Sequence, residues 1–459
     1  MKKIFLITVF VLGSNFVFSQ KIDNEIITKV QNKFDSEKNV ALINAISRNS
    51  YKSLVVNNTN ISKEDHFFTY YVISGSVTNQ HNSGRCWMFT SLNTLRPSII
   101  KKLNLSDFQF SHSYLFFWDM FEKSNMFLER IIATANSDIY SRELTALLSS
   151  PISDGGAWSS FVNLVDKYGV VPQNIMPETH HSDNTSELSS ILNQLLRKYA
   201  LELREMITSK KSNKDVQTRK IQMLSDVYKI LAYSLGEPPK TFQWRYKDKN
   251  GKMSDYKTYT PISFWKEIFN VNLTDYVMFM DDPTRPYYQL YYKQYDKNTF
   301  EGIDWTFINL PASEIKKFII LSLKDTQMLY FSCDVGKMLS KENASLDLNN
   351  FDYLSLFGID FSMDRKQQIL TQQSGSTHGM ALCGVELDKN GKPIKWKLEN
   401  SWGADYANKG YLTMTDDWFD VYFYRVVINK KYIDSKTLEI LKQKPIEVPF
   451  YNNAFSNDK

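Results

Sequence analysis

The sequence predicts an α+β protein, because patterns typical of helices and of strands occur in different stretches of the chain. Hydrophobic residues recur at helical spacing directly after Cys86 and again over residues 186–207. Two later runs, residues 327–336 and 380–385, are typical of buried strands, and residues 394–400 alternate between apolar and polar side chains. The chain of 459 residues is long for a single core, which favours a core domain that carries large insertions.

Other segments give weaker signals. A second long helix is expected to pass through residues 221–231 and to stop at Gly236, because two prolines follow that glycine. Residues 240–310 show little periodicity and predict only surface strands and loops. The remaining expected elements, in chain order, are an amphipathic helix at 23–38, a turn that opens a helix at 154–158, and a final helix and strand at 415–427.

The stretch around Cys86 carries the first candidate for chemistry. Gln80 lies six residues before Cys86, Gly84 lies two residues before it, and Trp87 follows directly. Because a helical pattern begins here, Cys86 is expected at a helix N-terminus, where unpaired N–H groups and the helix dipole favour a thiolate. We expect Gln80 to return beside this nucleophile and to offer a side-chain N–H to an oxyanion.

A nucleophilic cysteine needs a base and a group that orients the base. The chain contains six histidines, and His378 lies among small residues that suit a loop entering a strand. The next strand-like run ends with Asn400 on its apolar face, where an amide is costly to bury unless it is hydrogen-bonded. We therefore expect Asn400 to accept a hydrogen bond from His378, with Trp402 shielding that bond from water.

Three of these blocks, residues 80–87, 378–379 and 400–403, resemble the papain-like cysteine peptidases. The resemblance is closest to the family of bleomycin hydrolase and the bacterial aminopeptidase C, to whose motifs six segments are similar: residues 83–87, 113–118, 154–156, 167–172, 333–337 and 399–403. It extends over most of the chain, from about Val77 to about Pro449. It implies a two-lobed papain-like core, with a helical lobe and a β-barrel-like lobe, and no cofactor.

The resemblance also implies roles for individual residues. Cys86, His378 and Asn400 would form a catalytic triad that hydrolyses peptides through a thioester, with Gln80 at the oxyanion. Gly155 and Gly156 would line the substrate groove and form hydrogen bonds with the peptide main chain. Trp402 would also bind the substrate. On local evidence the two glycines fit a simple turn that begins a helix equally well.

The sequence indicates a leader and a short extension before the peptidase domain that the resemblance implies. The boundaries are a signal peptide at 1–19, an N-terminal extension at 20–75, and a papain-like domain at 76–459 with a helical insertion at about 180–240 and a C-terminal arm at about 445–459. The two helices of the insertion account for the long interval between Cys86 and His378.

The leader predicts export. Lys2 and Lys3 precede an apolar run at residues 4–11 that is too short to span a membrane comfortably, and small residues precede a cleavage site before Gln20. The alternative is an uncleaved N-terminal anchor. Because the resembled enzymes are generally cytosolic, a cleaved signal peptide moves the expected location to the periplasm, the cell surface or the medium. No later apolar run reaches membrane-spanning length.

The sequence gives little support for nucleic-acid binding or for a metal site. Loss of the leader leaves 53 basic and 50 acidic residues, a formal charge of +3, which is too small to indicate nucleic-acid binding. The pair His180 and His181 lies in a polar stretch with no cysteine or ordered carboxylate spacing nearby, so we interpret it as a solvated loop and expect no metal site.

The other two cysteines are expected to be structural. Cys333 and Cys383 lie in apolar strand contexts, where cysteine usually acts as a small buried hydrophobe. A disulfide between them is the alternative in an exported protein. Cys86 must stay reduced to act as a nucleophile, which predicts sensitivity to oxidants.

The exact peptidase activity stays open at this stage. In the resembled family the terminal carboxylate of the C-terminal arm pairs with the amino group of the substrate, which implies an aminopeptidase, and the assembly is a homohexamer with active sites facing an internal channel. This arm is about one residue longer, lacks a glycine near its end and finishes in Lys459. An endopeptidase or dipeptidase on the same triad, a frayed terminus, an acyl transferase and an inactive binding or scaffold protein therefore remain as alternatives.

Overall fold

The computed structural model describes residues 21–61 and 65–449 and contains two compact units, Met1–Val56 and Asn57–Lys459. The first unit carries α1 (Asn24–Gln31), α2 (Val40–Arg48) and α3 (Tyr51–Leu54), and none of these helices has a buried residue. The single helix expected at 23–38 is wrong in its second half. α1 ends at Gln31, and Asp35 then accepts a hydrogen bond from the backbone of Lys38, the local turn bonding that aspartate favours.

The second unit is built on a sheet of twelve strands among the described residues. Its order is β14-β5-β6-β4-β13-β7-β10-β11-β12-β9-β8, and β1 pairs with β10 beside this path. The strands are β1 (Tyr70–Tyr71), β4 (Tyr276–Met280), β5 (Gln289–Lys293), β6 (Thr306–Asn309), β7 (Leu329–Cys333), β8 (Leu339–Ser340), β9 (Ser345–Leu346), β10 (His378–Leu387), β11 (Pro393–Glu399), β12 (Tyr411–Thr415), β13 (Phe423–Asn429) and β14 (Ile446–Val448). A separate ribbon pairs β2 (Phe242–Trp244) with β3 (Lys257–Tyr259).

The centre of this sheet is buried on both faces. Every residue of β7 is buried, as are the first eight of β10, which explains why these strands are runs of apolar residues rather than alternating patterns. Most neighbouring pairs are antiparallel, whereas β4–β6, β5–β14 and β9–β12 are parallel. The expectation of surface strands at 240–310 is wrong for β4 and β6, because both lie inside the sheet and are largely buried.

Helices form the other part of the second unit. They are α4 (Asn58–Ile61), α5 (Cys86–Lys102), α6 (His112–Ala133), α7 (Arg142–Ser149), α8 (Trp158–Tyr168), α9 (His180–Asp183), α10 (Thr185–Thr208), α11 (Asn213–Leu235), α12 (Pro261–Phe264), α13 (Ala312–Lys324), α14 (Tyr353–Phe357), α15 (Arg365–Leu370), α16 (Asp416–Tyr422) and α17 (Ser435–Glu439). One-turn helices lie at η1 (Trp265–Phe269), η2 (Leu273–Asp275), η3 (Lys430–Tyr432) and η4 (Ile440–Lys442). No helix within residues 21–61 and 65–449 is both long and apolar enough to cross a bilayer.

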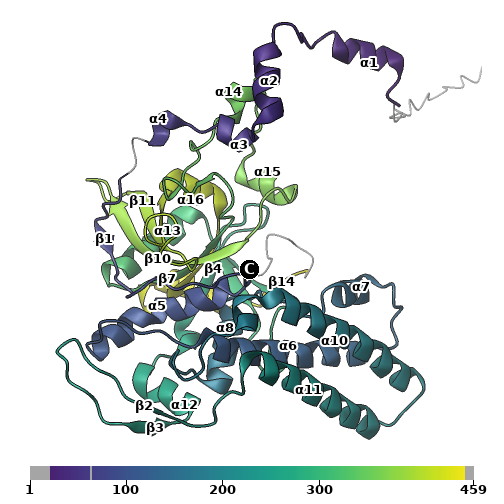
Figure 1. The fold of residues 1–459 in the computed structure, drawn as a ribbon, viewed down its shortest axis with the longest axis vertical. Helices are drawn as coiled ribbons and strands as arrows, with labels where there is room; N and C mark the ends of the chain where they lie inside the picture. Colours follow the sequence, from purple (N-terminus) through teal and green to yellow (C-terminus); the bar gives the residue numbers. More distant parts are fainter. Residues whose placement is uncertain (1–20, 62–64, 450–459) are drawn as a thin grey trace, which may run out of the picture. The chain divides into compact units, whose positions relative to one another are not determined.

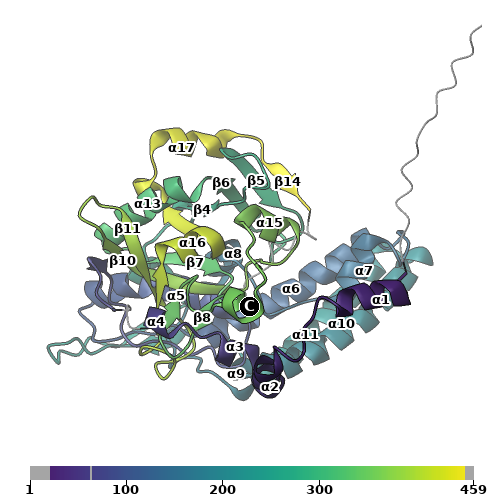
Figure 2. The same cartoon turned by 90° about the horizontal axis from the view of Figure 1, so that it is seen from above.

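The two long helices expected from periodicity are present as α10 and α11. They run beside α6, and both views show the three helices side by side (Figures 1 and 2). α11 stops at Gly236, whose φ of +86° favours glycine, as the sequence predicts. The final helix and strand expected at 415–427 are α16 and β13.

Two hydrophobic cores result from this arrangement. One is lined chiefly by residues of the helices α5, α6, α8, α10 and α11, and the other by residues of the sheet. α5 borders both, because Trp87 belongs to the helical core while the helix packs on β10 and β7. The residues of the expected signal peptide and residues 450–459 of the expected arm lie outside the described residues.

Candidate active site

Cys86 is the first residue of α5 and is fully buried. The preceding Arg85 is the N-cap, and no side chain caps the helix or places an acid in its first turn. The positive end of the helix dipole therefore favours negative charge on the sulfur. The expected position of Cys86 at a helix start is confirmed.

His378 and Asn400 meet at the edge where β10 begins and β11 ends. These strands are antiparallel neighbours, with Ala381 opposite Glu399, so the first residue of one lies near the residue that follows the other. His378 Nε2 and Asn400 Oδ1 are 2.8 Å apart. The Trp402 ring covers the His378 ring, with centroids 4.6 Å apart, and both members of the pair are buried.

The sulfur of Cys86 reaches the start of β10. The backbone N–H of Gly379 donates a hydrogen bond to Cys86 Sγ over 3.3 Å, so the residue next to His378 contacts the sulfur directly. An N–H donor stabilises negative charge on sulfur. A methyl group built on Gly379 would meet Thr90 and Trp87 at ordinary contact distances of 3.4–3.6 Å, so the glycine is not required here by lack of space.

Residues 80–86, here called the nucleophile loop, begin with Gln80. This residue contacts the segment that follows Asn400. Its Oε1 accepts a hydrogen bond from Ser401 Oγ at 2.6 Å, and its Nε2 donates to the carbonyl of Ser83 at 2.6 Å. A carboxamide nitrogen carries two hydrogens, so one N–H remains for a further acceptor. The structure thus brings Gln80, Cys86, His378 and Asn400 together from three separate parts of the chain, residues 80–86, 378 and 400.

The model of the Peptidase C1-like family matches residues 21–453 of this sequence. The chain belongs to the Peptidase C1-like family. Aminopeptidase C of Lactobacillus delbrueckii subsp. lactis is 39% identical over 84% of this chain and 86% of its own length. Bleomycin hydrolase of Gallus gallus is 39% identical over 82% of this chain and 85% of its own. The human bleomycin hydrolase is 33% identical over 95% and 98% of the two chains.

A solved structure shows the same fold. PepW from Lactobacillus rhamnosis superposes with a TM-score of 0.91 at 35% identity, over 96% of this chain and 100% of the other. The predicted papain-like α+β fold is therefore confirmed, as is the resemblance to bleomycin hydrolase and aminopeptidase C. This member of the Peptidase C1-like family is a cysteine peptidase.

The glycine pair assigned to substrate binding has a packing role in this peptidase. A Cβ on Gly156 would lie 2.6 Å from the ring of Trp87, so only glycine permits the close contact. The carbonyl of Gly155 accepts a hydrogen bond from Lys123 Nζ at 2.6 Å. Both glycines are buried just before α8, which also satisfies the interpretation as a turn that begins a helix. Their contact with substrate stays a prediction.

Two acidic residues that sequence reasoning missed hold the nucleophile loop. Asp154 Oδ2 accepts a hydrogen bond from the backbone of Gly84 at 2.6 Å. Glu178 pairs with Arg85, with Nη1 and Oε2 2.8 Å apart and the arginine side chain fully buried. Burial raises the pKa of Glu178, but the charges of Arg85 and His112 and the hydrogen bonds from Ser182 and Arg85 together hold that pKa below its usual value. The position of Arg85 next to Cys86 is the signal in the sequence that could have indicated Glu178, because an arginine that becomes buried needs an acidic partner.

The other two cysteines are buried as expected, whereas the histidine pair lies in a short helix. Cys333 and Cys383 are buried and are not joined by a disulfide, and burial raises the pKa of Cys383. The expectation of a loop at the histidine pair is wrong, because His180 and His181 form the first turn of α9, which a capping box of Thr179 and Ser182 stabilises.

Proposed function

We propose that this cysteine peptidase is an aminopeptidase whose Cys86, His378 and Asn400 act as a catalytic triad. The observation that carries the proposal is the continuous line of contacts from Asn400 Oδ1 to His378 Nε2, and from the neighbouring Gly379 N–H to Cys86 Sγ. Relatives named Aminopeptidase C and Bleomycin hydrolase support the same reaction class.

The hydrogen bond to Asn400 decides which nitrogen of His378 reacts. Because Nε2 donates to the amide oxygen, Nδ1 is the nitrogen left to exchange a proton with the substrate and Cys86. The sulfur attacks the carbonyl carbon of the scissile bond, and His378 then gives its proton to the leaving amine. Water, deprotonated by the same imidazole, cleaves the thioester that remains.

The oxyanion is stabilised by two donors. The backbone N–H of Cys86 lies at the uncapped start of α5, where the helix dipole adds to its effect. The free N–H of Gln80 is the second donor, and its direction is set by the bonds to Ser83 and Ser401. We expect Gln80→Ala to lower kcat by about 10²–10³-fold, the usual loss for one oxyanion donor.

The triad is tested by single substitutions and by thiol labelling. Cys86→Ala and His378→Ala should remove nearly all hydrolysis of a fluorogenic aminoacyl amide. Iodoacetamide should label Cys86 in preference to Cys333 and Cys383, because the start of α5 favours a thiolate at Cys86, whereas Cys333 and Cys383 lie in strands. Full peptidase activity in Cys86→Ala would disprove the assignment, whereas a wild-type protein without activity or selective labelling would favour the scaffold alternative.

The end of the chain distinguishes an aminopeptidase from an endopeptidase. The described part of the expected arm contains β14, which pairs in parallel with β5 at the edge of the sheet, and residues 450–459 continue beyond it. An aminopeptidase should cleave a substrate with a free amino group and spare its N-blocked analogue. Removal of residues 457–459 should reduce this discrimination if the terminal carboxylate binds the amino group. Equal cleavage of both substrates by the intact chain would favour the endopeptidase alternative.

Export and assembly are separate proposals. We expect cleavage before Gln20, so the N-terminal sequence of the protein purified from its natural host should begin there. In size-exclusion chromatography with light scattering, a hexamer should have about six times the mass of one chain, which is 53.6 kDa before removal of the leader. An intact leader would exclude cleavage before Gln20, and a stable monomer would exclude the hexamer.

A further inference from the structure

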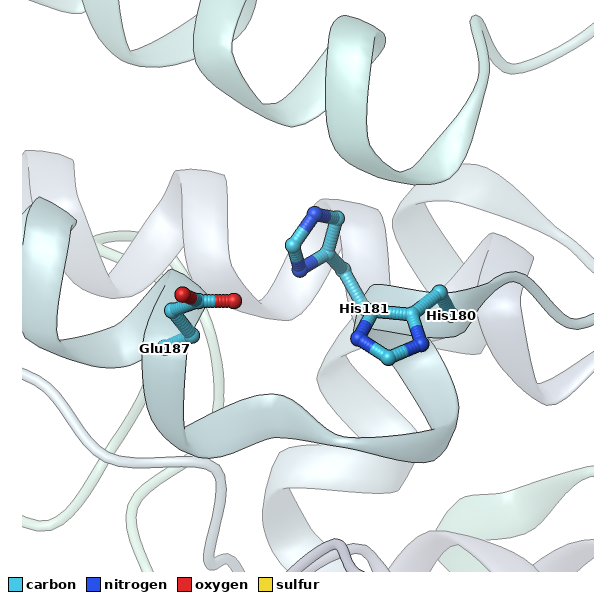
Figure 3. A group of neighbouring side chains, drawn as sticks. All are labelled: His180, His181 and Glu187. Atoms are coloured by element: carbon cyan, nitrogen blue, oxygen red, sulfur yellow. The ribbon is translucent and has the colours of Figure 1, made fainter.

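Three side chains on α9 and α10 converge away from the triad. The donor atoms of His180, His181 and Glu187 all lie within 4.8 Å of one another. The two imidazoles and the carboxylate face a common space (Figure 3). His180 and Glu187 are exposed, so an ion in solvent can reach this space.

One nitrogen of this group lacks a partner. His181 Nδ1 is buried and makes no hydrogen bond within the described residues. A buried polar atom without a partner destabilises the folded state, and a bound cation would remove that cost. The cluster was not recognised from sequence because Glu187 lies beyond a helix boundary at Asn184, which hides the spacing of the three ligands.

We propose that His180, His181 and Glu187 form a binding site for a divalent cation of the zinc class. Neutral imidazoles with one carboxylate suit Zn²⁺, Cu²⁺ and Ni²⁺ rather than Ca²⁺ or Mg²⁺, which prefer oxygen ligands. Three protein ligands leave a position for water. A hydrogen bond holds the start of α9, which carries both histidines, against α11. The Thr179 hydroxyl donates it to the carbonyl of Ser234 at 2.9 Å.

The site adjoins the segment that holds the nucleophile loop. His180 and His181 precede Asn184 and Glu187 follows it, so a shared ion ties α9 to α10 across this junction. The junction in turn holds Asn82, whose backbone N–H donates to Asp183 O at 2.9 Å and whose side chain donates to Asn184 Oδ1 at 3.0 Å. The cation therefore braces the loop that leads to Cys86 without contacting the sulfur.

The test uses untagged full-length Cys86→Ala protein, because a thiolate and His378 would themselves bind zinc. Zn²⁺ is titrated by calorimetry and Co²⁺ by its visible absorption. We expect one equivalent of each ion to bind, with affinity at least about tenfold weaker in His181→Ala and in Glu187→Gln. Glu205→Gln, an exposed carboxylate on the same helix, is the matched control and should bind as tightly as the parent protein.

Each outcome decides the proposal. Affinity unchanged by His181→Ala and Glu187→Gln, or no saturable binding up to about 1 mM free Zn²⁺, would overturn the site. Glu187→Gln alters an exposed group and retains the fold, so a loss of affinity there cannot be attributed to unfolding. Hydrogen exchange tests the brace: Zn²⁺ should slow exchange of the Asn82 amide in the parent and not in Glu187→Gln, and equal exchange would exclude it.

Discussion

His112 is a buried histidine whose protonation the fold opposes, so we expect stability to fall in mild acid. Its side chain is 2% exposed and its ring stacks on Phe89 with centroids 3.5 Å apart. Its Nε2 atom is buried without a hydrogen-bond partner in the described part of the chain. Burial lowers the pKa of His112 to about 3, and the charge of Glu178 only partly opposes this effect.

The size of the effect follows from proton linkage. In the unfolded chain the imidazole binds a proton below its ordinary pKa of 6.5, whereas the folded chain does not bind one until about pH 3. The stabilisation by neutral His112 is therefore complete above pH 6.5 and is lost as the pH falls towards 3. At pH 5, about 1.5 units below the pKa of His112 in the unfolded chain, the loss of stability is about 2 kcal/mol. This loss hardly depends on the pKa of His112 in the folded chain, because that pKa lies well below 5.

The assay compares free energies of unfolding in urea at pH 7 and pH 5. His112→Phe removes the titrating group and retains the stacked ring, so the wild type should lose about 2 kcal/mol more than the variant between these pH values. Phe89→Leu is the control, because it removes the stack and leaves the imidazole. It should retain the pH dependence of the wild type. An equal loss in the wild type and in His112→Phe would refute the reasoning.

Three further substitutions probe the site. Asn400→Ala removes a buried hydrogen bond to the imidazolium worth about 1.5–3 kcal/mol, so kcat/KM should fall about 10- to 150-fold with the fold intact by circular dichroism; activity equal to wild type would contradict the orienting role. Glu178→Gln leaves a buried arginine unpaired and should cost about 3–5 kcal/mol in urea unfolding, and a loss below 1 kcal/mol would mean that water replaces the carboxylate. Gly156→Ala should cost about 1–3 kcal/mol by overpacking Trp87, whereas Gly336→Ala, with nothing within 4 Å of the new methyl, should be close to neutral.

Local signals in the sequence are enough to place the candidate catalytic residues on their elements. The apolar periodicity that begins after Cys86 placed that residue at the start of α5, and the run of small residues before His378 placed it at the start of β10. The buried amide of Asn400 required a partner, and the structure provides His378 at 2.8 Å. Each of these inferences needed only spacing along one short segment and a rule about burial.

Partners far apart in the chain were not predictable in this way. Asp154 and Glu178 contact the nucleophile loop from 70 and 93 residues away, and the residues next to each acid do not indicate which distant segment it contacts. Residues 240–310 show little periodicity and predict only surface strands and loops, yet β4 and β6 lie inside the sheet. Burial of such strands depends on which neighbours cover them, and periodicity within one segment carries no information about those neighbours.

The contacts of the nucleophile loop connect the candidate catalytic residues to the helical region of this molecule. From the side of the sheet, Ser401 holds Gln80; from the helical side, Glu178 holds Arg85 and Asp183 holds Asn82. Since residues from both sides fix the same loop, a change at the start of α9 or α10 alters the geometry around Cys86 without touching it. Displacements of about 1 Å at such a distance are enough to cost about 10²-fold in rate, so substitutions in the 178–187 segment should lower kcat more than they raise KM.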